Sequence, residues 1–171
     1  MTQHASTNRG PLRESNSCFR PRDRNNSRLI HLVLEQFLPR FGFESITLRT
    51  GRRTRPSDVA TNLLGRLCIT PEILRQLPDI VAYSSSKNWV YLIECVHSAG
   101  HISPVRLAEL LKLTKNCRAE FVFVSAFLNR GEFCKFAHDI AWETEVWIAD
   151  APDHVVHFDG DKFFGPYARR T

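Results

Sequence analysis

Two carboxylates stand in otherwise apolar segments of the chain. Asp79 opens the segment 79–83, and Glu94 lies near the end of the segment 89–96. Both segments are rich in β-branched and aromatic residues, and a Ser/Lys/Asn break separates them, which predicts two strands joined by a turn. A carboxylate in a buried strand is costly unless a cation neutralises it. Paired strands would bring the two carboxylates together at one edge of a sheet.

Two such carboxylates and a backbone carbonyl form a hard oxygen site suited to Mg²⁺, the ion of phosphoryl chemistry. A structural interpretation stays open beside this one. In it, Asp79 caps the turn after Pro78, and Glu94 pairs with an arginine or lysine.

Length and composition indicate one globular domain. A chain of 171 residues can bury a sizeable core. No stretch approaches the roughly 20 apolar residues of a membrane span, so we expect no membrane association. The five cysteines are odd in number and form no Cys-x-x-Cys pair, which favours reduced thiols and a cytoplasmic location over a disulfide or zinc framework.

The positive charge is concentrated at the front of the chain. Residues 1–55 hold eleven arginines against four acidic residues, whereas the remainder carries a net charge of −2. This distribution indicates a polyanion bound by the basic part, although a solvated, solubilising tail is the alternative. The more informative arginines lie inside the expected domain: Arg49, Arg52, Arg53 and Arg55.

The remaining pattern predicts how these residues are positioned. Residues 1–27 form a disordered basic tail in this interpretation, and 28–171 form the catalytic domain. Alternating apolar segments and caps predict an α/β fold with a mixed central sheet flanked by helices. The expected helices cover 28–39, 58–67, 71–76, 104–116 and 130–142, and the further strands cover 43–48, 119–127, 146–149 and 154–158.

Several segments between Leu77 and Pro166 together resemble the catalytic region of the BsuBI/PstI family of type II restriction endonucleases. The matching segments are 77–81, 87–89, 92–94, 102–104 with Arg106, 124–127, 140–150, 152–154, 157–158 and 164–166. The resemblance implies a variant PD-(D/E)XK nuclease core. It also implies Mg²⁺-dependent cleavage of double-stranded DNA at a short palindromic site, CTGCAG for the named members. A homodimer and a cognate DNA methyltransferase would be the partners.

The resemblance assigns roles to individual residues. Asp79 and Glu94 would be the acidic pair of the motif and would bind Mg²⁺ with the carbonyl of Cys95. The lysine of the wider superfamily would fall at Val96, so another cation must assist. Lys87, Arg106 and Lys112 are the candidates, and Arg106 is preferred because the helix after the Glu94 strand can direct its side chain toward the sheet edge. An ordinary pair between Arg106 and Glu109 is the alternative.

DNA contacts are expected from the basic loop Arg49–Arg55 and from residues near the acidic pair. Strand alternation places Glu94, Val96 and Ser98 on one face. The full set of expected DNA-binding residues is Arg49, Arg52, Arg53, Arg55, Lys87, Ser98 and Lys112.

Two departures from the family support a different function. The family usually has Gly-Asp-Thr where this chain has Leu48-Arg49-Thr50, and its members carry a longer region before the nuclease core. A truncated or decayed nuclease that binds DNA without cutting is therefore the alternative. A zinc hydrolase is a further one, using His154 and His157 with Asp153, or His97 with His101, although strand alternation makes the first pair a poor chelate.

Overall fold

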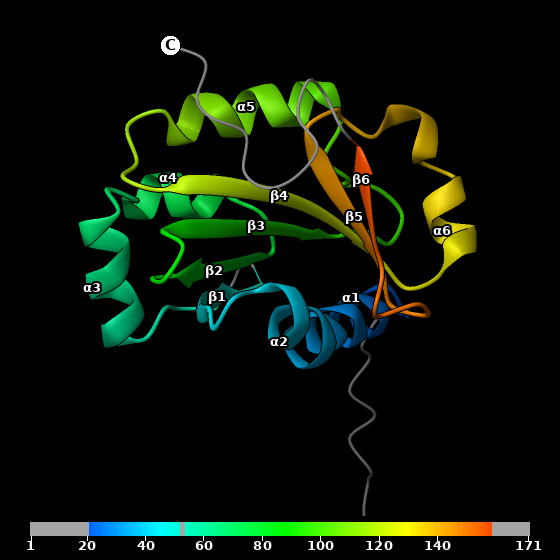
Figure 1. Ribbon diagram of the computed structural model, residues 1–171, viewed down its shortest axis with the longest axis horizontal. Helices are drawn as coiled ribbons and strands as arrows, with labels where there is room; N and C mark the ends of the chain where they lie inside the picture. The colour runs from blue at the N-terminus through cyan, green and yellow to red at the C-terminus, as the bar shows by residue number, and fades with distance from the viewer. Residues whose placement is uncertain (1–20, 52–53, 159–171) are drawn as a thin grey trace, which may run out of the picture.

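A six-stranded mixed sheet runs through the molecule with helices on both faces (Figure 1). The computed structural model describes residues 21–51 and 54–158. The strands lie side by side in chain order, which confirms the expected α/β class. They are β1 (Ile46–Thr50), β2 (Ile80–Ser84), β3 (Trp89–Cys95), β4 (Glu120–Phe127), β5 (Thr144–Ile148) and β6 (Val155–Phe158).

The strand directions follow from the connections. Residues 85–88 form a tight turn, so β2 and β3 pair antiparallel. Asn88 adopts a positive φ of 55° there, a conformation that asparagine tolerates better than most residues. The helix α5 (Pro104–Thr114) connects β3 to β4, and this crossover makes the two strands parallel. β5 is parallel to β4, whereas β1 and β6 pair antiparallel with their neighbours.

Alternation along the strands divides the core into two layers. Val81, Val90 and Leu92 face the helices α3 (Asp58–Arg66), α4 (Pro71–Gln76) and α5. Ile80 and Ile93, next to them in sequence, face the opposite layer. Figure 1 shows α5 above the sheet and the N-terminal helices below it. The parity of a residue on β2 or β3 therefore determines which layer its side chain meets.

The N-terminal helical segment begins earlier than predicted. Its parts are α1 (Pro21–Leu32), the π-helix η1 (Val33–Phe37) and α2 (Leu38–Phe41). The predicted start at Arg28 is therefore wrong, and residues 21–27 do not belong to a disordered tail. Residues 1–20 lie outside the described part of the chain. The wide π turn precedes Pro39, which has no N–H to donate to the carbonyl of Glu35.

The helix predicted over 130–142 is interrupted. It consists of α6 (Arg130–Cys134) and a 3-10 turn η2 (Ala137–Asp139). Ile140 then adopts an extended conformation, and the N–H of Ala141 donates to the carbonyl of Ile102. This contact with the loop before α5 ends the helical segment.

A bulge in β1 changes which side chains are buried. Thr47 lies opposite Ala82, but Arg49 lies opposite Val81, so Leu48 is the extra residue. Because of this shift, Leu48 and Arg49 both lie on the side of α4 although they are consecutive.

Candidate active site

Asp79 and Glu94 lie opposite each other at the same end of the β2–β3 hairpin. Ile80 pairs with Ile93, and continuing this antiparallel register places Asp79 across from Glu94. Residues directly opposite in such a pair point to the same face of the sheet. The face is the one covered by α5, because Val81 and Leu92 have the same parity as the two acids.

A hydrogen bond from the backbone of β3 to the side chain of Asp79 connects the two segments at this point. The N–H of Cys95 donates to Oδ2 of Asp79 at 3.2 Å. Asp79 is half-buried, whereas the side chain of Glu94 is only 2% exposed. The pair is therefore buried on the Glu94 side and accessible from the Asp79 side.

Arg106 provides the positive charge that the buried Glu94 requires. Its Nε and Nη2 donate to Oε1 of Glu94 at 3.2 and 3.0 Å. Nη2 also donates to the carbonyl of Gln76 at 2.8 Å, and Nη1 donates to Oε2 of Glu109 at 3.2 Å. Arg106 thus reaches the sheet edge as expected and also forms the ordinary pair with Glu109 that was the alternative, and its role as the assisting cation stays a prediction.

The start of α5 directs Arg106 toward the sheet. The hydroxyl of Ser103 accepts a hydrogen bond from the N–H of Arg106, and Pro104 occupies the first turn. The N–H of Ile102 donates to the hydroxyl of Ser125 on β4, which fixes the preceding loop to the sheet. This arrangement places the first turn of α5 over the end of β3.

The residues after Glu94 are apolar and buried. Burial raises the pKa of the Cys95 thiol well above its usual range, and the negative charges of Asp79 and Glu94 raise it further. Val96, where the resemblance would place the superfamily lysine, packs with Phe127 and Val146. The strand therefore provides no cation at this position, and Arg106 takes over the pairing with Glu94.

The donor set fits a hard divalent cation. Carboxylate oxygens on facing residues and a backbone carbonyl at Cys95 are the ligand types that Mg²⁺ prefers. One oxygen of Asp79 already accepts the Cys95 N–H, which brings this carboxylate next to the 94–95 peptide. The buried charge of Glu94 is compensated by Arg106, so the site can exist without a metal.

Arg49 is not placed to make the DNA contact predicted for it. Its side chain is buried, with 4% exposure, and its guanidinium donates to the carbonyls of Leu74, Leu77 and Pro78. A side chain committed to these carbonyls cannot reach a DNA backbone, so this prediction is wrong. The strand extends to Thr50, and the bulge in β1 directs Arg49 inward.

Lys87 is also far from the acidic pair. It lies in the exposed turn between β2 and β3, with its Nζ 5.0 Å from the ring centroid of Phe43. The carboxylates lie at the other end of the hairpin. At about 3.3 Å per residue, Trp89 and Glu94 alone are separated by about 16 Å. The structure therefore contradicts a role for Lys87 beside the acidic pair.

The other expected DNA-binding residues differ in how well they are placed. Lys112 is exposed on α5 and lines an open depression of about 550 Å³ together with Arg106 and Glu109. Ser98 is exposed in the loop after β3, so the prediction that it continues the strand face is wrong. Arg55 is exposed. Arg52 and Arg53 lie outside the described residues.

The first histidine pair proposed for zinc has other partners. His157 pairs with Glu145 across β5 and β6. Asp153 pairs with Arg40 at 2.6 Å. His154 is exposed in the turn before β6. Two of the three residues that this zinc site would use, Asp153 and His157, are therefore engaged by other side chains.

The second histidine pair has no support either. Nε2 of His101 lies 2.9 Å from Oδ2 of Asp139, and the ring of His101 packs against Phe136. Across residues 21–51 and 54–158, no group of three or more His, Cys, Asp or Glu side chains is placed to hold a metal ion. The zinc hydrolase alternative therefore lacks a ligand set in this part of the chain.

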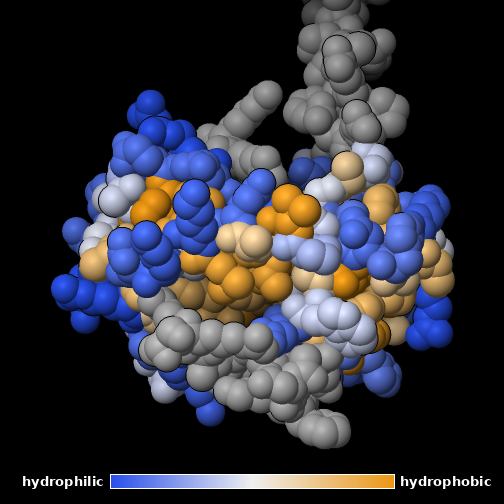
Figure 2. Space-filling model, turned by 90° about the horizontal axis from the view of Figure 1, so that it is seen from above, coloured by the Kyte–Doolittle hydropathy of each residue, from blue (hydrophilic) through white to orange (hydrophobic). Residues whose placement is uncertain are grey.

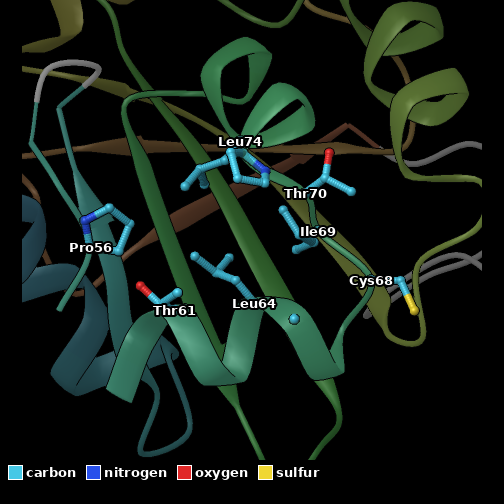
Figure 3. A pocket seen from close by; sticks show the side chains of 9 residues that line it. Pro56, Thr61, Leu64, Cys68, Ile69, Thr70 and Leu74 are labelled. Atoms are coloured by element: carbon cyan, nitrogen blue, oxygen red, sulfur yellow. The ribbon is translucent and has the colours of Figure 1, made fainter. Parts of the chain in front are cut away.

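Two apolar surface features were not expected from the sequence. A pocket of about 400 Å³ lies between α3 and α4, lined by residues including Leu64, Ile69 and Leu74 (Figure 3). On α5, Val105 and Leu111 are 72% and 51% exposed. Figure 2 shows apolar side chains among polar ones on the face seen from above, the side on which α5 lies in Figure 1.

In the part of the chain that the structure describes, no helix combines the length and apolar content that a bilayer crossing requires.

Comparison with known proteins gives consistent results. The BsuBI/PstI restriction endonuclease domain family matches residues 21–161. The type II restriction enzyme BsuBI of Bacillus subtilis is 39% identical over 145 residues, which are 83% of this chain and 45% of that enzyme. The type II restriction enzyme AplI of Arthrospira platensis (strain NIES-39 / UTEX 3086 / IAM M-135) is 33% identical over 143 residues, which are 79% of this chain and 44% of that enzyme. The structure of the SdaI restriction endonuclease superimposes with a TM-score of 0.72 at 33% identity, covering 84% of this chain and 46% of the other. The chain thus spans about half the length of these relatives.

Proposed function

Because the chain belongs to the BsuBI/PstI restriction endonuclease family and has the fold of a restriction endonuclease, we propose that it hydrolyses phosphodiester bonds in double-stranded DNA. The observation that carries this proposal is the facing of Asp79 and Glu94 across the end of the β2–β3 hairpin. The reaction is site-specific, and a palindromic target resembling CTGCAG is our proposal for the site.

Asp79, Glu94 and the Cys95 carbonyl would hold Mg²⁺. When bound, this ion supplies Lewis acidity and lowers the pKa of a coordinated water. The protein's own contribution is positional. The Cys95 N–H orients the carboxylate of Asp79, and Arg106 holds Glu94 at the end of β3. The side chain of Arg106 is 21% exposed, and its guanidinium would also steady the scissile phosphate.

Backbone contacts to DNA would come from exposed basic and polar side chains near this edge. Lys112 lies along α5 from Arg106, and Ser98 lies in the loop after β3. Arg55 would contact flanking phosphates. Such contacts add affinity and a strong salt dependence but carry little sequence information.

A palindromic target would require a twofold dimer that presents one site to each strand. A DNA methyltransferase of the same specificity would protect the host DNA, and the enzyme would meet incoming DNA in the cytoplasm. These assignments are part of the proposal because the chain spans about half the length of its relatives.

The alternative is a domain that binds DNA without cutting it. The observation in its favour is the ion pair between Arg106 and Glu94. The arginine in this pair neutralises the negative charge of Glu94 that a metal ion would otherwise neutralise. In that case Arg106 acts as a permanent structural partner of Glu94.

One experiment separates the two functions. The purified chain is incubated with mixed-sequence DNA, with and without Mg²⁺, and the ends of any products are sequenced. Fragments with a common end sequence, formed only with Mg²⁺, support the nuclease. Intact DNA at all metal concentrations, together with a salt-sensitive gel shift, supports the binding protein.

A further inference from the structure

Arg49 lies beneath the turn that carries Asp79. Its guanidinium donates to the carbonyls of Leu74, Leu77 and Pro78, the last of which belongs to the peptide preceding Asp79. The contact to Leu77 measures 2.9 Å. The side chain is 4% exposed, so these bonds form away from bulk water, where they are strong and costly to break.

A second contact from the same strand end fixes Asp79 itself. The N–H of Gly51 donates to the carbonyl of Asp79 at 2.6 Å. Gly51 adopts a φ of 68°, a conformation that residues with a Cβ rarely adopt. The side chain of Arg49 and the backbone of Gly51 thus hold three successive carbonyls, those of residues 77, 78 and 79.

The geometry of the carboxylate pair depends on this segment. Asp79 precedes the first paired residue of β2, Ile80, so ladder pairing alone does not fix its position. Arginine is suited to this task because its planar guanidinium presents several N–H donors in fixed directions and keeps its charge. The bulge in β1 directs the side chain of Arg49 toward α4.

We propose that Arg49 is a positioning residue, which holds the backbone of residues 77–79 so that the carboxylate of Asp79 faces Glu94 and can share a divalent cation with it. The proposal adds a positioning residue to the proposed nuclease site. It rests on the nuclease function for the identity of the cation. Arg49 touches neither DNA nor the reacting atoms. Its effect is transmitted through the peptide that precedes Asp79.

Two substitutions test this role in the full chain. Arg49→Met keeps the apolar stem and removes every donor, whereas Arg49→Lys keeps the charge but cannot reproduce the planar set of donors. Loss of a residue that orients a metal ligand typically lowers metal affinity by about 10–100-fold. We expect this loss for Arg49→Met in Mn²⁺ binding measured by calorimetry, and a partial recovery for Arg49→Lys. Arg75→Met is the matched control, because Arg75 is an exposed arginine of α4 that pairs at the surface with Glu72.

The amide of Cys95, compared with the amide of Val90 on the same strand, distinguishes a local change at Asp79 from general destabilisation. It donates to Asp79 Oδ2, so its NMR shift and its hydrogen-exchange protection report on that carboxylate. In a folded Arg49 variant, we expect the Cys95 amide to lose protection while the amide of Val90, in the middle of the same sheet, keeps it.

The outcomes are distinct. A folded Arg49→Met variant with unchanged Mn²⁺ affinity and an unchanged Cys95 amide overturns the proposal. If Arg49→Met does not fold, Arg49→Lys decides by the same two measurements, and failure of both variants to fold overturns a role specific to Asp79. If the variants behave as expected but the parent protein cuts no DNA with Mg²⁺, the positioning role stands and the nuclease function fails.

Discussion

Arg106 donates two hydrogen bonds to a single oxygen, Oε1, of the buried Glu94. The helix α5 thereby provides a positive charge next to Glu94, whereas Val96, two residues further along the chain, is apolar and buried. The same guanidinium contacts Gln76 and Glu109, so its position is set by three separate elements of the chain.

Asp79→Ala and Glu94→Ala should each abolish Mg²⁺-dependent cleavage, because either change removes a charged ligand from the proposed cation site. Circular dichroism should show a folded protein for Asp79→Ala, whose side chain is only half-buried. Plasmid cleavage over a Mg²⁺ series measures the effect. Glu72→Ala, which removes an exposed carboxylate from α4, is the control and should cut normally. Cleavage by the Asp79→Ala, Glu94→Ala double variant would remove both residues from the mechanism.

Arg106→Ala should destabilise the fold by about 3–5 kcal/mol, because it leaves the carboxylate of Glu94 buried without its arginine. Glu109→Ala removes only the exposed partner and should cost less than about 1 kcal/mol. Urea unfolding of both variants measures the difference. Equal midpoints for the two would show that the pair between Arg106 and Glu94 adds no stability.

Lys112→Ala should weaken DNA binding several-fold and reduce the salt slope of log Kd by about 1, as expected for one lost phosphate contact. Lys87→Ala should leave both unchanged, because Lys87 lies at the other end of the β2–β3 hairpin. Fluorescence anisotropy with labelled DNA at several salt concentrations compares the two lysines. The placement of DNA along α5 is wrong if Lys87→Ala has the larger effect.

Cys95 should resist alkylation at pH 8, because burial and the charges of Asp79 and Glu94 raise its pKa and keep the thiol protonated. Cys134 is exposed and should react first with iodoacetamide. Peptide mass spectrometry over time gives both rates. Asp79→Asn removes one of the two negative charges and should accelerate the labelling of Cys95, whereas labelling at equal rates in the parent protein would contradict its burial.

The protein should lose stability as the pH rises from 10 to 12. Burial raises the pKa of Tyr91 to about 12, so the unfolded chain ionises first and is favoured over this range. The hydroxyl of Tyr91 donates to the carbonyl of Phe41 at the end of α2. Tyr91→Phe should cost about 1 kcal/mol at pH 7 and flatten this part of the pH profile. Thermal unfolding between pH 7 and 12 tests the prediction. The prediction fails if the parent protein and Tyr91→Phe lose the same stability at alkaline pH.

Local sequence patterns were sufficient for much of the sheet. The β-branched and aromatic segments around a short polar break predicted β2 and β3, and the register of that hairpin places Asp79 opposite Glu94. The helices predicted to start at residues 58, 71 and 104 begin at Asp58, Pro71 and Pro104 in the structure. These features depend on residues that are close in sequence, where the pattern carries the information.

What was missed depends on contacts between distant segments. The burial of Arg49 requires the β1 bulge and carbonyls of α4 and of the segment after it, and neither leaves a local pattern. The interruption of the helix predicted over 130–142 reflects a hydrogen bond to Ile102. The earlier start of α1 at Pro21 lies in a polar segment without the apolar periodicity that marks a buried helix.

The turn at residues 85–88 offers a practical site for attachment. It is exposed and lies a full strand away from the acidic pair. A fluorophore or a surface tether placed there would leave the opposite edge of the sheet open to large ligands. Single-molecule observation of the protein on stretched DNA could therefore use this turn as its anchoring point.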